Sequence, residues 1–228
     1  KRMKIIRHQT ITGSIEYAAL QSDGKALRIA GDFFGDFQVT EASVSPGRLL
    51  APLRPTAIFC IGLNYRKHAA ESNAPIPEHP VVFMKSIGSV QNPGDNIFLP
   101  SHLKSQEVDY ECELAVVIGK ACKNVSKANA LDYVLGYTCA NDVSARDWQK
   151  EKHLNGGQFA RGKSFDTFAP IGPYLVTADE VPDPQKLQIK LWVNGQLKQN
   201  FNSDDMAHKI PRCIEWVSHI HDLEPGDI

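Results

Sequence analysis

Short apolar segments with the character of β-strands recur along most of this chain, and connections that contain glycine or proline separate them. In the larger part of the chain these segments are 57–62, 81–84, 97–99, 113–118, 134–140, 174–176 and 187–193. Helical patterns are fewer and lie at about 65–72, 127–134, 144–150 and 211–220. Long proline-bearing connections such as 73–80 break the alternation of strand and helix that a parallel α/β sheet requires. The pattern therefore predicts an α+β fold that is dominated by sheet.

The N-terminal part of the chain differs from the rest. It holds short strand-like pieces, the clearest at 4–7 and 15–20, and a turn signal at Asp23-Gly24. A proline-bearing linker, 46–55, follows them. We therefore expect a small β-rich N-terminal module over residues 1–53 and a larger domain over residues 54–228.

Composition excludes several classes of protein. The 228-residue chain has a formal net charge of -1 and no basic stretch beyond the short segment 1–4, which argues against a nucleic-acid partner. No apolar run approaches the roughly 20 residues that a membrane helix needs, so no membrane partner is expected. The five cysteines are scattered and form no Cys-x-x-Cys pair, which suits a reducing compartment. We expect a cytoplasmic protein, or one of the mitochondrial matrix if a transit peptide has been removed.

Glu111 and Glu113 lie two residues apart in a segment that continues into an apolar run, 114–118, and therefore resembles a strand. Side chains at i and i+2 of a strand share one face. Two adjacent carboxylates repel each other unless they are solvated, one is protonated, or a cation lies between them. Oxygen ligands suit Mg²⁺, Mn²⁺ or Ca²⁺ better than zinc. The pair alone leaves a cation site and an exposed acidic strand end equally open.

Asp142 ends another short strand pattern, 136–142, and a helical pattern, 143–150, follows it. A strand-to-helix junction exposes side chains at the edge of a sheet, so Asp142 could supply a third carboxylate. Arg146 and Gln149 lie three residues apart on one helix face, and offer a fork of donors for a carboxylate and an amide for a second oxygen. Taken alone, the junction more simply indicates a capped surface helix with a solvated Arg146.

His68 and Glu71 lie at i and i+3 of a helical pattern, after Asn64 as a plausible N-cap. A carboxylate beside an imidazole raises its basicity and fixes its tautomer, although a surface ion pair is the simpler interpretation of these two residues alone. Lys163 would ordinarily be a loop lysine. In a dry pocket beside a cation, however, the pKa of Lys163 could be lowered so that the side chain carries protons.

Several longer motifs resemble the fumarylacetoacetate hydrolase family, in the family's order, from about Pro55 to the last residue. They are Asn64-Tyr65 with His68 and Glu71, the segments 109–119, 141–149 and 162–173, Val193-Asn194-Gly195 and Pro225-Gly226-Asp227. The segments 106–109 and 146–149 are closest to the branch that contains fumarylacetoacetate hydrolase domain-containing protein 2. The resemblance implies a mixed β-sheet roll with few helices for residues 54–228, which would be the catalytic domain, and a homodimer.

The resemblance also implies residue roles. Glu111, Glu113 and Asp142 would hold one divalent cation, Mg²⁺ or Mn²⁺, with Ca²⁺ as a further option. His68 and Glu71 would correspond to the family's water-activating dyad.

The same resemblance places Lys163 in the pocket as a catalytic residue, and Arg146, Gln149 and Thr167 as substrate-binding residues. In the family the Pro-Gly-Asp motif continues into further strands, so we expect the sequence to be incomplete after Ile228.

These parts suit chemistry on 2-oxo acids, which present a carboxylate oxygen and a keto oxygen to one cation. The cation would polarise the keto group and stabilise an enolate. We expect a metal-dependent C–C bond hydrolase of the fumarylacetoacetate or acylpyruvate type. The alternatives are an oxaloacetate tautomerase or decarboxylase, or a hydratase or isomerase of aromatic-degradation intermediates. A non-catalytic domain with a structural Ca²⁺ would not require Arg146, Gln149 and Lys163 around the ion.

Overall fold

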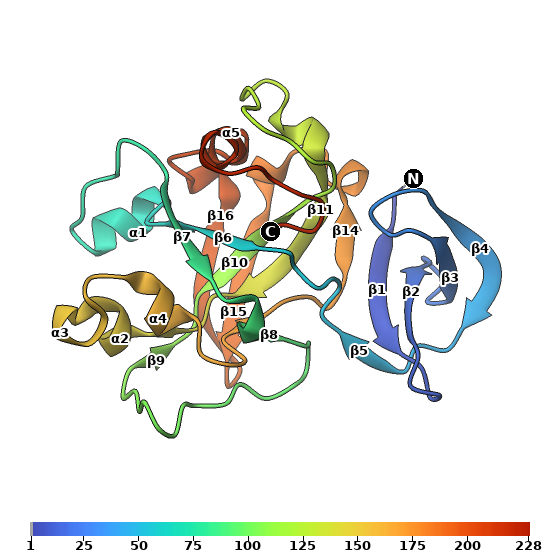
Figure 1. Ribbon diagram of the computed structural model, residues 1–228, viewed down its shortest axis with the longest axis horizontal. Coiled ribbons are helices and arrows are strands. Elements are labelled where there is room, and N and C mark those ends of the chain that lie inside the picture. Colours follow the sequence, from blue (N-terminus) through green and yellow to red (C-terminus); the bar gives the residue numbers. More distant parts are fainter. Residues whose placement is uncertain (1) are drawn as a thin grey trace.

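The computed structural model describes residues 2–228, apart from the side chain of Asn155. Its largest element is an eight-stranded sheet with the order β10-β11-β14-β1-β2-β3-β4, and β5 pairs with β1 (Figure 1). The strands are β1 (Lys4–Gln9), β2 (Ile15–Leu20), β3 (Ala26–Gly31), β4 (Phe37–Val44), β5 (Arg48–Leu50), β10 (Cys112–Ile118), β11 (Val134–Asn141) and β14 (Leu175–Thr177). The sheet-dominated α+β fold predicted from the sequence is confirmed.

The N-terminal strands continue the main sheet. β1 pairs antiparallel with β14, so that Lys4 lies opposite Val176 and Ile5 opposite Leu175. The strands β1 to β4 curl at the right of Figure 1, away from the helices. Ile5 and Leu175 are fully buried in one apolar cluster that draws on both parts of the chain. The division at residues 53 and 54 stays a prediction.

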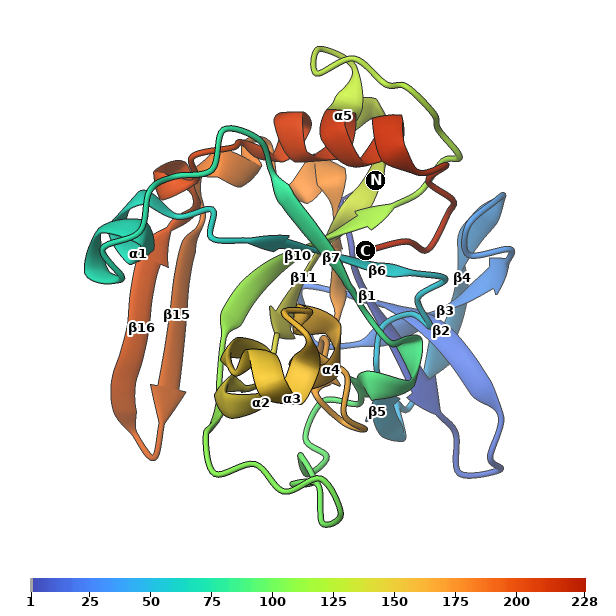
Figure 2. The ribbon, with the colours of Figure 1, turned by 60° about the vertical axis from the view of Figure 1, so that its left-hand side comes forward.

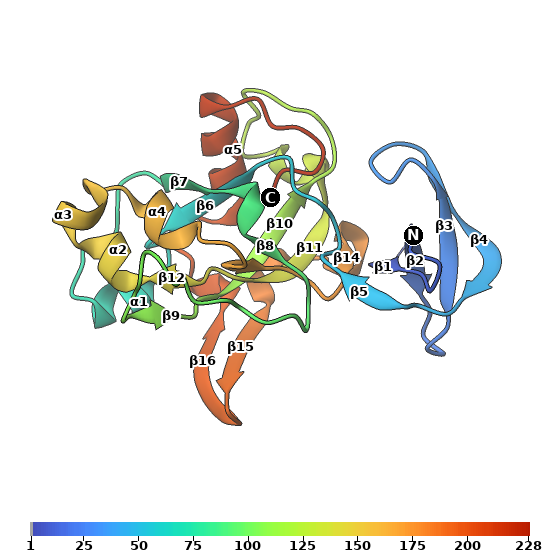
Figure 3. The ribbon, with the colours of Figure 1, turned by 60° about the horizontal axis from the view of Figure 1, so that its bottom comes forward.

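Short two-stranded sheets surround the main sheet. Their strands are β6 (Ile58–Gly62) with β7 (Val81–Lys85), β8 (Val90–Gln91) with β13 (Ala169–Pro170), β9 (Val108–Asp109) with β12 (Ser144–Ala145), and β15 (Gln188–Val193) with β16 (Gln196–Asn202). The β15–β16 hairpin extends away from the body of the molecule (Figures 2 and 3). Its turn, Asn194-Gly195, has φ angles of 50° and 76°, which are the positive values that a tight hairpin turn requires.

The longest helix, α5 (Ile210–Ile220), covers one side of the main sheet. Its buried residues Ile210, Ile214 and Val217 recur at i, i+4 and i+7, and they pack with Ile118 and Tyr137 of β10 and β11. The other helices are α1 (Arg66–Glu71), α2 (Arg146–Lys150), α3 (Lys152–Asn155) and α4 (Phe159–Lys163), with 3-10 turns η1 (Ile87–Ser89), η2 (Ala130–Tyr133), η3 (Ala178–Glu180), η4 (Pro184–Lys186) and η5 (Ser203–Asp205). Within residues 2–228, no helix is long and apolar enough to cross a membrane.

Two predicted elements differ in the structure. The segment 97–99 is not a strand: Phe98 is 64% exposed, and its backbone N–H donates to the Thr167 hydroxyl rather than to a sheet. The helical pattern at 127–134 shortens to the single turn η2, because Val134 already pairs with Ile118 as the first residue of β11. Apolarity and propensity are weak signals over so few residues, and tertiary pairing overrides them.

Candidate active site

Three carboxylates converge where β10 begins and β11 ends. Glu111 lies directly before β10, Glu113 lies within it, and Asp142 directly follows β11. The Asp142 N–H donates to the Glu111 carbonyl (2.9 Å), which extends the β10–β11 ladder by one residue and places these side chains on the same face. One ligand oxygen of each carboxylate lies within 4.8 Å of the others. The structure thus brings together the three residues that the sequence predicts as a cation site.

Two buried lysines neutralise part of this negative charge. Lys163, the last residue of α4, donates to Asp142 Oδ2 (2.5 Å), Glu111 Oε2 (2.8 Å) and the Ser144 hydroxyl (2.7 Å). Lys85, the last residue of β7, donates to Asp142 Oδ1 (2.5 Å). The side chains of Lys85, Lys163 and Asp142 are each at most 3% exposed. Charges that are buried this deeply persist only when they are paired.

The surroundings shift the pKa values of Asp142 and Glu113 in opposite directions. Burial opposes ionisation of Asp142, but the ammonium groups of Lys85 and Lys163 outweigh it and lower the pKa of Asp142. Burial first, and then the charges of Asp142 and Glu111, raise the pKa of Glu113 to about 8. Glu113 is therefore mainly protonated at neutral pH in the metal-free cluster, and a cation would have to displace that proton.

Lys163 carries a proton in this geometry. Burial alone would lower the pKa of Lys163, but the carboxylates of Asp142 and Glu111 outweigh it and raise the pKa. The direction is opposite to the lowered pKa that we expect beside a bound cation, because here the lysine itself is the cation that balances the carboxylates. Lys163 is also part of a helix rather than a loop, since α4 ends at this residue.

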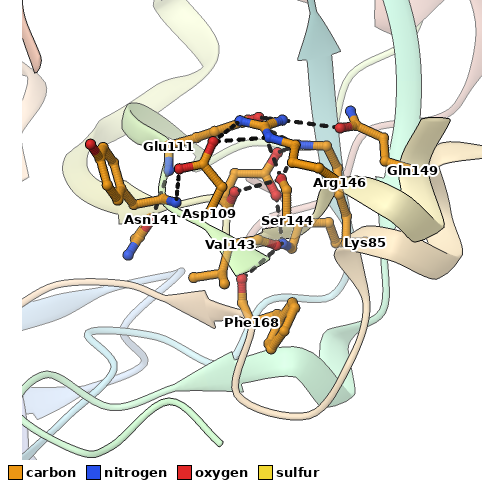
Figure 4. A network of polar contacts seen from close by, with 12 residues as sticks. Lys85, Asp109, Glu111, Asn141, Val143, Ser144, Arg146, Gln149 and Phe168 are labelled. Atoms are coloured by element: carbon orange, nitrogen blue, oxygen red, sulfur yellow. Dashed lines mark hydrogen bonds and ion pairs between the residues drawn. The ribbon is translucent and has the colours of Figure 1, made fainter. Parts of the chain in front are cut away.

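Arg146 faces acidic residues in this structure (Figure 4). Its Nε and one terminal nitrogen donate to Asp109 Oδ2 (3.0 and 2.9 Å). The other terminal nitrogen donates to Glu111 Oε1 and to the Gln149 side-chain carbonyl. Burial opposes the charged guanidinium, but Glu111 first and then Asp109 raise the pKa of Arg146. The predicted Arg146–Gln149 fork therefore exists, and its donors bind protein acceptors.

His68 and Glu71 lie on α1 and are largely solvent-exposed, at 63% and 78% of their side-chain areas. His68 Nδ1 lies 3.9 Å from a Glu71 oxygen. The predicted N-cap is wrong: Tyr65 occupies that position. The Asn64 side chain bridges instead to His208, donating to its carbonyl and accepting from its N–H, both at 2.8 Å. The start of α1 is thus tied to the segment before α5.

Thr167 lies in a strained turn, directly before the residue whose carbonyl binds Lys85. Its φ of 70° is rare for a β-branched residue, and its hydroxyl accepts from the Phe98 N–H (2.8 Å). The next residue, Phe168, is fully buried, and its carbonyl accepts from Lys85 Nζ (2.8 Å). Strain of this kind persists where the surrounding structure fixes the backbone, often at functional sites.

The donor set fits a divalent cation with a preference for oxygen. Three carboxylates from two adjacent strand ends supply only oxygen atoms, which suits Mg²⁺, Mn²⁺ or Ca²⁺. Burial first, and then the neighbouring charges of Asp142 and Glu111, raise the pKa of Glu113, and a bound cation would offset both effects by stabilising the ionised carboxylate. Glu111, Glu113 and Asp142 are therefore the residues that would hold it.

Three residues that complete this cluster are not among the predicted site residues: Lys85, Asp109 and Ser144. Lys85 ends an apolar strand pattern at 81–84, and a charged residue in line with a buried strand is a signal that could have identified it. Asp109 is two residues before Glu111, but it lies in β9 whereas Glu111 precedes β10, so the two-residue period of a single strand does not place it in the site. Ser144 gives no such signal, because serine is common at helix starts.

Comparison with known proteins agrees with the motifs. The model of the fumarylacetoacetate (FAA) hydrolase C-terminal family matches residues 57–228, and an N-terminal family described as Rv2993c-like matches residues 3–52. The mitochondrial oxaloacetate tautomerase of Xenopus laevis is 50% identical over 79% of this chain and 56% of its own length. This chain thus spans just over half the length of that relative.

Solved structures are similar as well. The 2-hydroxyhepta-2,4-diene-1,7-dioate isomerase from Mycobacterium marinum superposes with a TM-score of 0.85 at 37% identity, over 99% of this chain and 84% of that one. Maleylpyruvate hydrolase from Sphingobium, solved with manganese(II) and pyruvate, gives a TM-score of 0.66 at 35% identity, over 79% of this chain and 61% of that one. The family model matches three quarters of the chain, and the solved structures share its fold. The chain therefore belongs to the fumarylacetoacetate hydrolase family.

Proposed function

We propose that this protein is a divalent-metal-dependent enzyme acting on 2-oxo acids, and that it catalyses keto–enol tautomerisation of an oxaloacetate-like substrate. One observation carries the proposal: the protonated Lys163 lies between Glu111 and Asp142, inside a cluster of three carboxylates. A proton donor thus adjoins the residues that would hold the cation. The name of the Xenopus relative supports the choice of tautomerisation among the reactions of the family.

In this proposal Glu111, Glu113 and Asp142 hold Mg²⁺ or Mn²⁺, and the manganese in the maleylpyruvate hydrolase structure supports the choice of metal. A bound cation would polarise the keto group of a 2-oxo acid as a Lewis acid. Lys85 and Lys163 limit the net negative charge of the cluster, which keeps a dianionic substrate from being repelled.

Lys163 moves the proton. Tautomerisation transfers one proton between a carbon and an oxygen of the same substrate, so one residue that gives a proton and takes one back is sufficient. Lys163 holds its proton through Asp142 and Glu111, and its third partner is the buried hydroxyl of Ser144. When Lys163 gives up its proton, the Ser144 hydroxyl can reorient to donate to the neutral amine.

Arg146, Gln149 and Thr167 line the substrate side of the cluster in this proposal. Asp109 keeps two guanidinium nitrogens of Arg146 occupied, and the third bonds Glu111 and Gln149. A substrate carboxylate would therefore bind Arg146 at that third nitrogen, in exchange for Glu111. The two hydrogen bonds that Arg146 donates to Asp109 Oδ2 would keep the guanidinium oriented during the exchange.

The test is an ultraviolet assay of enol-oxaloacetate with and without Mn²⁺, run beside a coupled assay for pyruvate. We expect enol absorbance to decay faster with protein and metal, pyruvate release to be absent, and EDTA to remove the effect. Glu113→Gln and Asp142→Asn should abolish it. Pyruvate release from oxaloacetate would instead identify a decarboxylase, and metal-independent decay would refute the proposal.

C–C bond hydrolysis of an acylpyruvate is the second candidate, and the His68–Glu71 pair favours it. The two side chains share one face of α1 with His68 Nδ1 3.9 Å from a Glu71 oxygen, so a small rotation would form the hydrogen bond by which a carboxylate orients a general base. Both are exposed, so this reaction would require α1 to close over the substrate. Metal-dependent release of pyruvate from an acylpyruvate would establish it.

A further inference from the structure

Lys85 occupies a central position in the site. Its Nζ donates to Asp142 Oδ1 (2.5 Å), to the Phe168 carbonyl (2.8 Å) and to the Val143 carbonyl (3.3 Å). Figure 4 shows Lys85 beside Val143 and Phe168. An ammonium group has three N–H donors, and each has an acceptor here. The side chain is 2% exposed. Lys85 is therefore fully bonded within the protein.

The two buried lysines differ in what holds them. All three acceptors of Lys163 are side-chain oxygens, of Asp142, Glu111 and Ser144. Two of the three acceptors of Lys85 are main-chain carbonyls. A side-chain acceptor can rotate to a new partner, whereas a main-chain carbonyl is fixed by the fold. Lys163 can thus exchange partners during a reaction while Lys85 stays in place.

The carbonyls that hold Lys85 are themselves well anchored. The Phe168 carbonyl also accepts from the Val143 N–H (3.1 Å), which ties the turn at 165–168 to the end of β11. Val143, Ala145 and Phe168 form a buried apolar cluster. Lys85 thereby joins three segments: β7, the β11–β12 junction and the strained turn that contains Thr167.

We propose that Lys85 is a positioning residue for the cation site: it holds Asp142 Oδ1 and so turns Oδ2 toward Glu111. The proposal rests on the proposed cation site of Glu111, Glu113 and Asp142. Oδ2 is the oxygen that shares Lys163 with Glu111, so it is the one directed into the cluster. Lys85 itself contributes no ligand, and acts through the geometry of Asp142.

The positioning role and the charge of Lys85 predict opposite changes in cation affinity when Lys85 is removed. A positive charge next to Asp142 repels a divalent cation, so its removal should strengthen cation binding if charge were all that Lys85 supplied. If Lys85 positions Asp142, its removal should weaken cation binding, because Asp142 loses the contact that fixes its rotamer. Residues that orient metal ligands typically contribute 10–100-fold in affinity, which sets the scale at about tenfold or more.

The experiment measures Mn²⁺ binding to the full chain by calorimetry and by the electron paramagnetic resonance signal of free Mn²⁺, without substrate. Lys85→Met should raise the Mn²⁺ dissociation constant at least about tenfold while the protein still unfolds cooperatively. Lys198→Met, on the exposed face of β16, is the matched control and should bind as the wild type does. Equal or tighter binding by Lys85→Met overturns the proposal.

Two further variants complete the test. Lys85→Ala leaves a space of the length of propylammonium, and added propylammonium should restore Mn²⁺ affinity if the ammonium group positions Asp142. This variant also serves if Lys85→Met does not fold, and a folded Lys85→Ala that propylammonium fails to rescue overturns the inference. Glu113→Gln separates the two proposals: Mn²⁺ binding that survives this change refutes the cation site itself, and the role of Lys85 with it.

Discussion

Gly162→Ala should displace Lys163 from the carboxylate cluster. Gly162 lies in α4, and a Cβ at this position would lie 2.7 Å from the backbone nitrogen of Gln149 and 2.9 Å from the carbonyl oxygen of Ala145. Both atoms belong to the backbone at or just before α2, which lies beside α4 in Figures 1 and 3. No side-chain rotation can relieve such contacts, so α4 has to move away from α2.

Two effects of opposite sign decide how far Gly162→Ala changes the free energy of unfolding. Alanine is better than glycine in a helix by up to about 1 kcal/mol. Overpacking against a fixed backbone costs about 1–3 kcal/mol. The net expectation is a loss of up to about 2 kcal/mol in the free energy of unfolding. Catalysis is more sensitive: a 1 Å misplacement of reacting groups can cost about 10²-fold, so a smaller shift of Lys163 should lower turnover about tenfold.

Urea denaturation and enol-oxaloacetate decay measure the two effects in one preparation. Ala160→Gly, in the same helix, is the control for helix propensity: it should lose stability without a tenfold loss of turnover. A Gly162→Ala protein that is as stable as the wild type and turns over at the same rate would refute the close-contact argument.

Three other predictions follow from the site. Because the pKa of Glu113 without metal is about 8, its proton competes with the cation at lower pH, and Mn²⁺ affinity should increase by up to about tenfold for each unit by which the pH is raised toward 8. Calorimetry that finds the same Mn²⁺ affinity across a pH series would contradict this. His68→Ala should reduce acylpyruvate hydrolysis by about 10²–10⁴-fold and enol-oxaloacetate decay only modestly, and equal losses on both substrates would argue against a separate dyad. Light scattering should report a homodimer, as the family resemblance implies, and a monomer at micromolar concentration would count against it.

The sequence predicts the placement of the carboxylates well because the relation is local. Glu111 and Glu113 share a strand face by the two-residue period alone, and Asp142 follows the strand that pairs with theirs. The partners of Arg146 could not be predicted in the same way. The fork of donors was visible in the sequence, but Asp109 reaches it only through the short β9–β12 pairing, which brings residues 108–109 beside 144–145.

The contact of Lys85 with Asp142 could not be predicted from the sequence either. The strand that ends in Lys85, β7, pairs only with β6 within residues 2–228, and the contact with Asp142 depends on how that antiparallel pair, whose strands are joined through α1, packs across the end of β11. No local period encodes packing of this kind. The segment 97–99 shows the converse: its apolar pattern predicts a strand, but within residues 2–228 it pairs with no sheet edge.

The pairing of β1 with β14 has a consequence for how the chain acquires its fold. Met3 and Lys4 bond with residues near position 177, and the Thr177 N–H donates to the Met3 carbonyl (3.0 Å). The Lys4–Ile5 end of β1 therefore lacks its β14 partner until residues 175–177 have left the ribosome. Closing so large a loop is slow, although each doubling of its length adds only about 0.6 kcal/mol to the entropic cost. During synthesis β2 and β5 can already pair with β1, while the stretch around Ile5 waits as an exposed apolar edge of the kind that chaperones bind.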